Sequence, residues 1–248
     1  MSKLTNHCLI LAAGNGSRLM SQSRGIPKPL VRLCGVPLLN HVMLRAHEAG
    51  VDNFVVVLGY RGDMIRGWYN AHPLSGVTAT WVENPDYHKS NGISALKARD
   101  YLCDPFLLLM SDHLFEAKTA EALLKEPLAA DEVILAVDPN IDRVFDLDDA
   151  TKVRREGNHI VDIGKEIPDY DALDTGMFLC SPALFNTLES AMKDGNCSLS
   201  DGMREFGRAR KFRAFDIGDA HWQDVDTPEA LAYAESMFTR NFGVKLAA

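Results

Sequence analysis

The sequence lacks long apolar runs and cysteine pairs at the spacing of a metal or redox site. No stretch approaches the ~20 apolar residues that a membrane span requires, so we expect no membrane insertion. The N-terminal residues show no signal-peptide pattern. The five cysteines are scattered and have no CxxC spacing, which is typical of proteins kept in a reducing compartment. These absences predict a cytoplasmic protein.

Positive charge is also scarce, because the formal net charge is −8. A protein that binds nucleic acid or an anionic membrane surface broadly needs a basic face to neutralise phosphates. We therefore expect no nucleic-acid partner. A small anionic ligand remains compatible with this charge, since it needs only a local basic cluster.

Short β-branched apolar runs alternate with helix-periodic segments over the first 138 residues. This alternation is typical of βαβ units packed on a mostly parallel sheet. The expected helices cover residues 38–46 and 93–101, and the expected strands cover residues 8–13, 54–59, 78–83, 106–111 and 133–137. The pattern predicts an α/β fold with a Rossmann-like, doubly wound, mixed but mostly parallel sheet. The length of 248 residues is compatible with one domain over residues 1–248.

The pattern changes after Asp138 to shorter and more polar strands. Gly157-Asn158 is a plausible tight turn between them. We expect a small β-rich insertion, around residues 139–175, that covers the edge of the sheet. The chain then returns with strands over residues 176–180 and 212–217, helices starting near residues 183 and 199, and a last helix capped by Thr227.

A glycine-rich loop with the sequence LAAGNGSRL follows the first expected strand, and Lys28 follows in the segment PKPL. Glycines let backbone N–H groups converge on an anion, while Arg18 and Lys28 can neutralise a triphosphate. A GxG pair alone could merely turn the chain. A Rossmann fingerprint fits less well, because Leu19 occupies its third glycine position. The Walker ending GK[ST] is absent from the sequence.

Acidic residues follow an apolar strand and precede the last helix. Asp112 comes directly after the strand over residues 106–111, where an open α/β sheet presents its ligand-binding edge. Asp224 and Asp226 lie just before the last expected helix. Mg²⁺ favours one or two carboxylates together with phosphate oxygens and waters. Asp112 could instead cap the next segment, and Asp226 could interact only with the helix macrodipole.

The LAAGNGSRL and PKPL segments, in this order and spacing, resemble the signature of the sugar-nucleotide type nucleotidyltransferase superfamily. The resemblance implies a GT-A-like nucleotidyltransferase fold that joins a nucleoside monophosphate from an NTP to a phosphorylated small molecule. It implies that Arg18 and Lys28 bind the triphosphate and the transition state, and that Asp112 and Asp226 hold Mg²⁺. Asp224 is the competing metal ligand. The nucleotide would lie on the loop residues Leu11, Ala12, Ala13, Gly14, Asn15, Gly16 and Ser17.

A polar loop leads from the strand over residues 78–83 into a helix rich in small residues. Amide side chains can read a base edge through paired donors and acceptors. Ser90 or Asn91 could equally be an ordinary N-cap. In the superfamily the equivalent loop holds base and ribose, so the resemblance makes candidate nucleotide contacts of Asn84, Ser90, Asn91, Gly92 and Ser94.

Three residues are candidates for binding the acceptor. Lys165 is expected to act in catalysis with Arg18 and Lys28 by binding the acceptor's phosphate. A solvated lysine at a strand edge is the commoner use of such a residue, but the segment around Lys165 resembles the family's substrate-phosphate lysine. Asp174 can bind a hydroxyl group. His113 lies beside Asp112 and is a candidate acceptor contact.

The segments LMSDHLF, DTGMF and DVDTPE look most like the CTP:inositol-1-phosphate cytidylyltransferase branch, and the resemblance covers essentially the whole chain. It implies transfer of CMP from CTP to inositol-1-phosphate with release of pyrophosphate. Branch members are often fused to a membrane-embedded alcohol phosphotransferase. No hydrophobic continuation follows Ala248, so we expect the stand-alone form.

The acceptor is open at this stage. Related cytidylyltransferases act on phosphocholine or on phosphonates such as 2-aminoethylphosphonate and 2-hydroxyethylphosphonate. The expected partners are therefore CTP and a small phosphate- or phosphonate-bearing acceptor, and a homodimer is compatible with the sequence. A different class of protein, a non-catalytic nucleotide-binding regulator, would keep the fold without turnover.

Overall fold

A computed structural model describes residues 4–20 and 25–241 of the chain. Ala248, on which the expectation of a stand-alone form rests, lies outside these ranges. The main sheet of the described residues has nine strands in the order β5-β4-β1-β6-β11-β8-β12-β10-β9. In chain order they are β1 (His7–Ala12), β4 (Asn53–Leu58), β5 (Thr78–Glu83), β6 (Phe106–Met110), β8 (Val133–Asp138), β9 (Lys152–Glu156), β10 (His159–Gly164), β11 (Ala172–Cys180) and β12 (Phe212–Asp216).

The sheet is parallel in its first half and mixed in its second. Strand β4 pairs in parallel with β5 and β1, and β1 pairs in parallel with β6. Strand β11 is antiparallel to both β6 and β8, while β8 and β12 are parallel. The predicted fold class, a mixed α/β sheet of doubly wound type, is confirmed. All five strands expected before residue 138 are present within one residue of their expected bounds.

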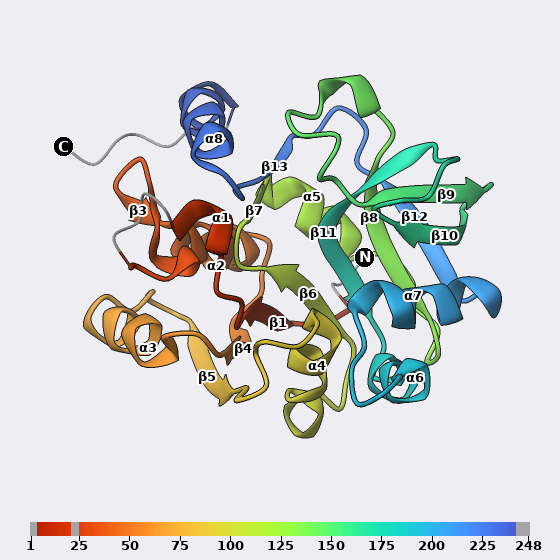
Figure 1. Cartoon of the computed structure of the whole chain (residues 1–248), viewed down its shortest axis with the longest axis horizontal. Helices are drawn as coiled ribbons and strands as arrows, with labels where there is room; N and C mark the ends of the chain where they lie inside the picture. The colour runs from red at the N-terminus through yellow and green to blue at the C-terminus, as the bar shows by residue number, and fades with distance from the viewer. Residues whose placement is uncertain (1–3, 21–24, 242–248) are drawn as a thin grey trace.

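Strands β9 and β10 lie in the segment 139–175 and form the expected hairpin, with Gly157 at a φ of +65° in the turn. The hairpin does not simply cover the edge of the sheet. Strand β10 pairs with β12, and β9 pairs back onto β11. The strands from β11 to β9 therefore form a closed ring, which lies on the opposite side of the molecule from α3 and β5 (Figure 1).

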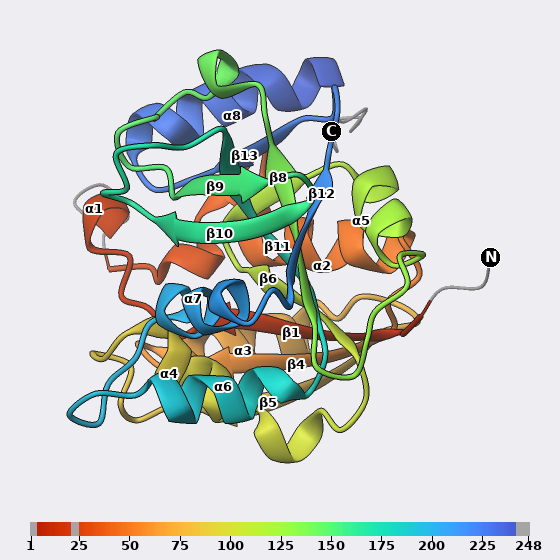
Figure 2. The ribbon, with the colours of Figure 1, turned by 90° about the vertical axis from the view of Figure 1, so that its right-hand side faces the viewer.

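Helices cover both faces of the sheet (Figure 2). Among the described helices longer than four residues, α3 and α5 have no counterpart in the sequence-based expectation. The helix expected over residues 93–101 is divided into α4 and η2. No described helix is long and apolar enough to cross a bilayer. The helices are α1 (Ser17–Met20), η1 (Lys28–Leu30), α2 (Leu38–Glu48), α3 (Gly62–Ala71), α4 (Asn91–Leu96), η2 (Arg99–Tyr101), α5 (Ala117–Leu123), η3 (Ile141–Arg143), α6 (Ala183–Ala191), α7 (Leu199–Arg208) and α8 (Pro228–Asn241).

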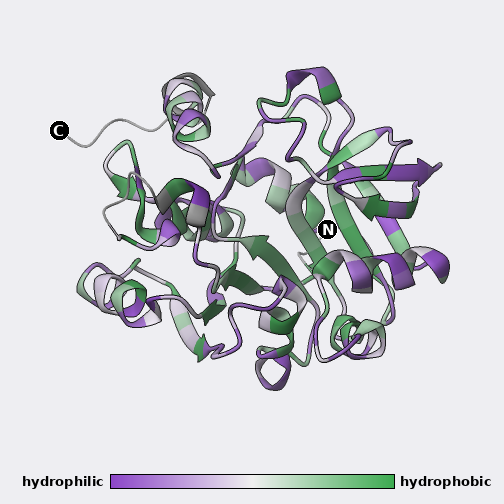
Figure 3. Ribbon diagram, in the orientation of Figure 1, coloured by the Kyte–Doolittle hydropathy of each residue, from purple (hydrophilic) through white to green (hydrophobic). Residues whose placement is uncertain are grey.

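Strand alternation divides the core between the two faces. Successive side chains of a strand point to opposite faces, so Cys8 and Ile10 of β1 pack with α2, α3 and α5, while Leu9 and Leu11 pack with α4, α6 and α7. The central strands are the most hydrophobic part of the ribbon in Figure 3, and the outer surfaces of the helices are hydrophilic. A sheet covered on both faces leaves its strand ends as the place for a ligand.

Two short antiparallel pairs flank the sheet. Strand β2 (Arg32–Leu33) pairs with β3 (Val36–Pro37), and β7 (His113–Phe115) pairs with β13 (Trp222–Asp224). In the β7–β13 pair, His113 lies opposite Asp224, and the Val225 N–H donates to the Asp112 carbonyl over 3.0 Å. This pair brings the last acidic segment beside the end of β6. Thr227 then caps α8, as expected, because its Oγ1 accepts from Ala230 N at 3.1 Å.

We expect Phe106→Ala to lower the free energy of unfolding by about 3 to 5 kcal/mol. The Phe106 side chain is fully buried, and its ring stacks on Phe185 with the centroids 5.5 Å apart. Urea unfolding monitored by circular dichroism measures the change. Tyr101→Ala is the control, since Tyr101 is 50% exposed, and it should shift stability by less than about 0.5 kcal/mol. Equal losses from the two variants would contradict this account of the core.

Candidate active site

A cavity of about 310 Å³ lies at the carboxyl ends of β1 and β6. The two strand ends meet because β1 and β6 are adjacent and parallel, with Leu11 paired to Met110. Most of the residues expected to hold a nucleotide, and both expected metal ligands, line it. The lining residues are Leu11, Ala12, Ala13, Gly14, Asn15, Gly16, Arg18, Lys28, Pro29, Tyr87, Lys89, Asn91, Ser94, Met110, Ser111, Asp112 and Asp226. Ser17 begins α1, and its side chain lies outside what the structure describes.

The loop after β1 is shaped to let Lys28 approach closely. Gly16 has a φ of +59°, and a Cβ at this position would lie 2.6 Å from the Cβ of Lys28. Glycine is therefore required twice, for its backbone conformation and for the space. Pro27 and Pro29 flank Lys28 at the start of the short helix η1, and the Lys28 side chain is only 7% exposed.

The Lys28 ammonium lies between two carboxylates from distant parts of the chain. It contacts Asp112 Oδ2 and Asp226 Oδ1. Burial alone would lower the pKa of Lys28, but the charges of Asp112 and Asp226 outweigh burial and raise it. Burial would likewise raise the pKa of Asp112, yet Lys28 and a hydrogen bond from His113 hold it far below its ordinary range. Lys28 and Asp112 are therefore both charged at neutral pH.

A second carboxylate bridge extends this ion-pair network. Asp226 Oδ2 accepts from Arg18 Nη2 at 2.8 Å, and Arg18 Nη1 lies 2.7 Å from Asp149 Oδ2. The other oxygen of Asp149 accepts from Lys165 Nζ at 2.6 Å. Burial would raise the pKa of Asp149, but its hydrogen bonds with Lys165 and Arg18 lower it. Cations and anions thus alternate from Lys165 through Arg18 to Lys28.

His113 continues the network beyond Asp112. Its Nδ1–H donates to Asp112 Oδ1 over 2.8 Å, and its ring stacks on Trp222 with centroids 6.1 Å apart. Gly176, at a φ of +74°, leaves space for the ring, since a Cβ there would collide with it. Burial would lower the pKa of His113, but the hydrogen bond and the negative charges of Asp112 and its neighbours raise it to about 9.

Two smaller cavities adjoin His113. Their volumes are about 150 and 120 Å³, and they share His113, Thr151 and Asp174. The first also has Phe178 in its wall. The second has Lys165, Trp222, Asp149, Asp224 and Asp226 in its wall. Asp226 lines both this cavity and the one at the β1 loop, so the cavities meet at the ion-pair network.

Asp174 occupies the wall between the two smaller cavities. Burial raises its pKa to about 6, against the hydrogen bond from Gly176 N at 2.7 Å and the nearby charge of His113. It therefore gives the pocket a carboxyl group whose charge depends on its surroundings. All three residues expected to bind the acceptor, His113, Lys165 and Asp174, lie together in this region.

The loop before α4 divides the expected base contacts into two groups. Asn91 and Ser94 line the larger cavity. Asn84 is buried, donates to Ser94 Oγ and accepts from Asp86 N, each at 2.9 Å. Neither Asn84 nor Ser90 nor Gly92 is among the described residues that line the cavity. Asn84 thus orients Ser94. Gly92 has a packing role, because a Cβ at this position would lie 2.6 Å from the Cys197 carbonyl oxygen.

The carboxylates of the site fit a hard cation such as Mg²⁺. Asp112 and Asp226 converge on one point, where both contact Lys28. Oxygen atoms of Asp149, Asp224 and Asp226 also lie within 4.8 Å of one another. Carboxylate oxygens are the donors that Mg²⁺ prefers, with the remaining positions filled by water and phosphate. Asp224 stays a competing ligand, because it lies beside Asp226 in this group.

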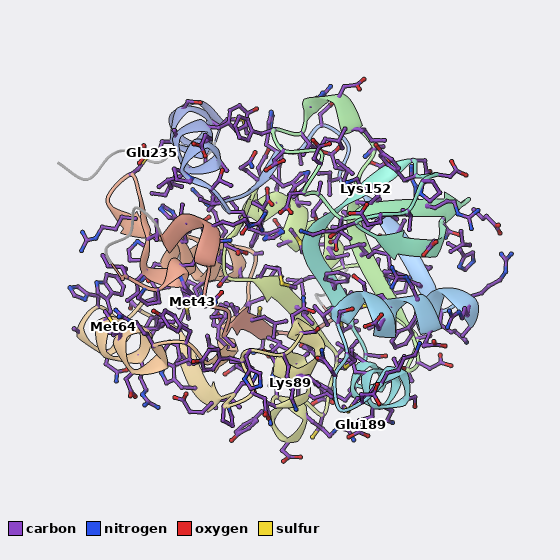
Figure 4. All side chains as sticks on the ribbon, viewed as in Figure 1. Met43, Met64, Lys89, Lys152, Glu189 and Glu235 are labelled. Carbon is purple, nitrogen blue, oxygen red and sulfur yellow. The ribbon has the colours of Figure 1, made fainter. Side chains whose placement is uncertain are left out.

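Several lining residues were not identified from the sequence. Asp149, Thr151 and Trp222 belong to no recognised motif, and only the closed ring of strands and the β7–β13 pair bring them to the site. Tyr87 and Lys89 lie in the loop before α4, three and five residues past Asn84, and Lys89 is labelled in Figure 4. A basic residue inside that polar loop was the available signal for Lys89.

We expect His113 to titrate near pH 9 in the metal-free protein, because its imidazolium is held by Asp112. A folded-state pKa above the unfolded value of 6.5 adds stability that is complete below about pH 6.5 and is lost as pH rises through about 9. For a partly exposed ring the loss should be on the order of 2 kcal/mol. NMR titration of the imidazole in EDTA, with unfolding measured across the same range, checks both statements.

Asp112→Asn is the matched variant for this titration. It removes the anion beside the ring and should move the pKa of His113 back towards its ordinary value. A wild-type His113 that titrates near pH 6.5 would contradict the assigned hydrogen bond.

Residues 8–208 match the family of MobA-like NTP transferase domains. A "Bifunctional IPC transferase and DIPP synthase" of Rubrobacter xylanophilus is 37% identical over 92% of this chain and 51% of its own length. A "CMP-5'-(3-aminopropyl)phosphonate synthase" of Streptomyces rubellomurinus is 29% identical over 93% of this chain and 38% of its own length. The chain thus spans about half the length of the first of these relatives.

Solved structures of nucleotidyltransferases are also similar to this chain. The inositol-1-phosphate CTP transferase from T. maritima superposes with a TM-score of 0.85 at 27% identity, covering 97% of each chain. A UDP-glucose pyrophosphorylase complexed with UDP-glucose has a TM-score of 0.78 at 18% identity, over 95% of this chain and 98% of its own, and shows the fold alone. The resemblance expected from the LAAGNGSRL and PKPL segments is confirmed: the chain belongs to the MobA-like NTP transferase domain family.

Proposed function

We propose that this domain transfers CMP from CTP to a small acceptor that carries a phosphate or phosphonate, with inositol-1-phosphate as the preferred acceptor. One observation carries the proposal. A cavity lined by the glycine-rich loop and a second cavity lined by Lys165 and Asp174 share Asp226, and the row of ion pairs runs between them. Such a junction is where two anionic substrates have to meet.

The reaction is an in-line displacement at the α-phosphorus of CTP. An anionic oxygen of the acceptor's phosphate forms the new bond to phosphorus, and the bond to the bridging oxygen breaks as pyrophosphate leaves. The nucleophile is already an anion, so no strong general base is required. Catalysis consists of bringing two anions together and stabilising the charge that develops.

The cations of the junction suit this task. Arg18 and Lys28 line the larger cavity, where they would bind the triphosphate and the transition state. Lys165 lines the smaller cavity and would bind the acceptor's phosphate. Backbone groups of the loop from Leu11 to Ser17 would hold the nucleotide. Each cation would exchange a carboxylate partner for a phosphate oxygen.

Mg²⁺ would be held by Asp112 and Asp226. Bound there, the ion would neutralise charge on the phosphate oxygens of the substrate. The two carboxylates are positioned by the β7–β13 pair, because Val225 N bonds to the Asp112 carbonyl at 3.0 Å. Asp224 is the alternative ligand, although burial raises its pKa.

Cytosine is favoured as the base because the similar proteins named for CMP and CTP are 29% and 27% identical to this chain, whereas those named for UTP and UDP-glucose are 25% and 18% identical. Asn91 and Ser94 line the nucleotide cavity on the side of α4 and offer amide and hydroxyl groups to a base or ribose. The Asn91 amide oxygen already accepts from Leu199 N at 2.9 Å. Its NH₂ group is therefore the end available to a ligand.

The cavity of about 150 Å³ beside Asp174 has both apolar and polar groups in its wall, which would suit a polyol acceptor. Its wall combines the apolar Phe178 and Met203 with the hydroxyl groups of Thr151 and Ser200 and the carboxyl group of Asp174. A cyclic polyol presents C–H faces and a rim of hydroxyl groups, which match such a wall. The similarity to an inositol-1-phosphate CTP transferase points to the same acceptor.

An aminoalkylphosphonate is the second candidate acceptor. Asp174 and Asp224 both line the smaller cavity and could pair with an ammonium group. A relative named for a CMP-aminopropylphosphonate supports this alternative. Phosphocholine and 2-hydroxyethylphosphonate remain further candidates for the same reaction. A nucleotide-binding regulator without turnover is the alternative from a different class.

Pyrophosphate release in the presence of Mg²⁺ tests the proposal. We expect release with CTP and inositol-1-phosphate, and at least about tenfold less with UTP, GTP, ATP or dTTP, a ratio that needs only about 1.4 kcal/mol of discrimination. Phosphocholine, the two phosphonates and hexose 1-phosphates serve as competing acceptors. Release with CTP and a phosphonate would keep the mechanism and change the acceptor. Tight binding of CTP without release from any pair would favour the regulator.

Asp226→Asn should lower turnover by about 100-fold or more, because Asp226 faces both cavities and a charge-stabilising group in such sites has effects of this size. Asp224→Asn should cost less than about tenfold, an effect below about 1.4 kcal/mol. Asp224 Oδ1 already accepts from Gln223 Nε2 at 3.2 Å. Turnover measured against Mg²⁺ concentration separates loss of metal binding from loss of chemistry. The opposite order of the two variants would assign the metal to Asp224.

A further inference from the structure

We propose that Asp149 is a positioning residue that holds Arg18 and Lys165 beside each other and so sets where the acceptor's phosphate meets the triphosphate. The inference rests on the proposed function, because it takes Arg18 and Lys165 as the cations for the two substrates. Asp149 itself lies in no recognised motif, and only the structure brings it to the site.

The geometry shows one carboxylate divided between two cations. Asp149 Oδ1 accepts from Lys165 Nζ at 2.6 Å, and Asp149 Oδ2 lies 2.7 Å from Arg18 Nη1. The second arm of the guanidinium, Nη2, contacts Asp226 at 2.8 Å. Asp149 thus links the cation that lines the larger cavity, Arg18, to the cation that lines the smaller one, Lys165.

Asp149 is itself held firmly by its neighbours. Ala150 is buried, and its N–H donates to the Asp146 carbonyl over 3.1 Å. Lys152, labelled in Figure 4, is also buried, and its ammonium donates to the Asp148 carbonyl over 3.0 Å. These two bonds fix the turn just before β9 from both sides of Asp149. Its carboxylate lines the cavity of about 120 Å³ from this constrained turn.

The two cations need such an anchor. Their side chains are 47% and 49% exposed, and both are long and flexible. Two positive charges also repel each other at short range. A shared carboxylate offsets that repulsion and restricts the rotamers of both side chains before the substrates bind, which removes part of the ordering cost from the reaction.

If Asp149 acted only through its charge, it would weaken the binding of anionic substrates rather than assist it. A negative charge beside two bound anions weakens their binding by repulsion, so its removal should then tighten binding. If Asp149 positions the cations, its removal should instead weaken binding and slow turnover. The sign of the change separates the two roles.

The first experiment compares Asp149→Asn with the wild-type chain in steady-state assays of pyrophosphate release. We expect kcat/KM for the acceptor to fall on the order of 10- to 100-fold, with most of the loss in kcat. Asp149→Glu keeps the carboxylate and should recover part of the loss. A lower KM for the acceptor at unchanged kcat would overturn the inference.

Asp148→Asn is the matched control. It makes the same change of charge one residue away, at an exposed side chain that forms no hydrogen bond or ion pair with the residues that the structure describes. We expect its kinetics to stay within twofold of the wild type. A loss equal to that of Asp149→Asn would mean that net charge or the turn, rather than the bridge, is responsible.

A double-mutant cycle tests whether Asp149 acts through Lys165. If it does, adding Asp149→Asn to Lys165→Met should cost little more in kcat/KM for the acceptor than Lys165→Met alone. Losses that multiply in full would show that Asp149 acts independently of Lys165 and would contradict the proposed bridge.

Calorimetry makes the test independent of turnover. Inorganic phosphate and pyrophosphate stand in for the acceptor and the leaving group, and Asp149→Asn should bind both at least about fivefold more weakly, a change near 1 kcal/mol. Tighter binding would overturn the inference. A wild-type chain that binds both anions but releases no pyrophosphate from any substrate pair would count against the proposed function, while the calorimetric comparison would still decide the role of Asp149.

Discussion

The contact of the Lys28 ammonium with Asp112 and Asp226 is the interaction on which the rest of the site depends. It joins the segment after the β1 loop, the end of β6 and the segment before α8, three parts of the chain separated by at least 84 residues. Two carboxylates held this close would repel each other without a cation between them. Lys28 is buried, and removal of one partner from a buried ion pair is strongly destabilising because it leaves an uncompensated charge. The same contact therefore explains why Gly16 must leave space for Lys28 and why the β7–β13 pair must hold Asp226 against β6.

The ion-pair network explains how a protein of negative net charge could bind anionic substrates. The net charge of −8 describes the whole surface, whereas the cations of the site are collected in one row and balanced by internal carboxylates. Binding of phosphate and metal would exchange partners within that row rather than create new charges. Charged groups that are already oriented do not have to reorganise during the reaction. His113, whose pKa is raised to about 9 by Asp112 and its neighbours, ends the row on the acceptor side.

Much of the nucleotide side could be predicted from the sequence, because it is built from contiguous segments. The strand before LAAGNGSRL, the PKPL segment and the capped helix after DVDTPE each have a local signal. On the proposed acceptor side the sequence indicated only His113, Lys165 and Asp174. Asp149 and Thr151 reach the site only because β9 pairs back onto β11, a long-range pairing that no local pattern indicates. Asn84 was a reasonable candidate by type, yet folding uses its amide to orient Ser94. Helix α3 was not predicted because it begins at a glycine, after Arg61 in the left-handed conformation.

This division between local and long-range segments explains how one fold can serve different acceptors. The proposed nucleotide contacts come largely from the ends of β1 and β6, the centre of the parallel sheet, where a change would disturb the core on both faces. The proposed acceptor contacts come largely from Thr151, just before β9, from Asp174 and Phe178 on β11, and from Met203 on α7. Substitutions there can alter the shape and charge of the acceptor cavity while Lys28, Asp112 and Asp226 stay in place. The chemistry of transfer and the choice of acceptor are thus built on separate parts of the chain, and the bridge at Asp149 is where the two parts meet.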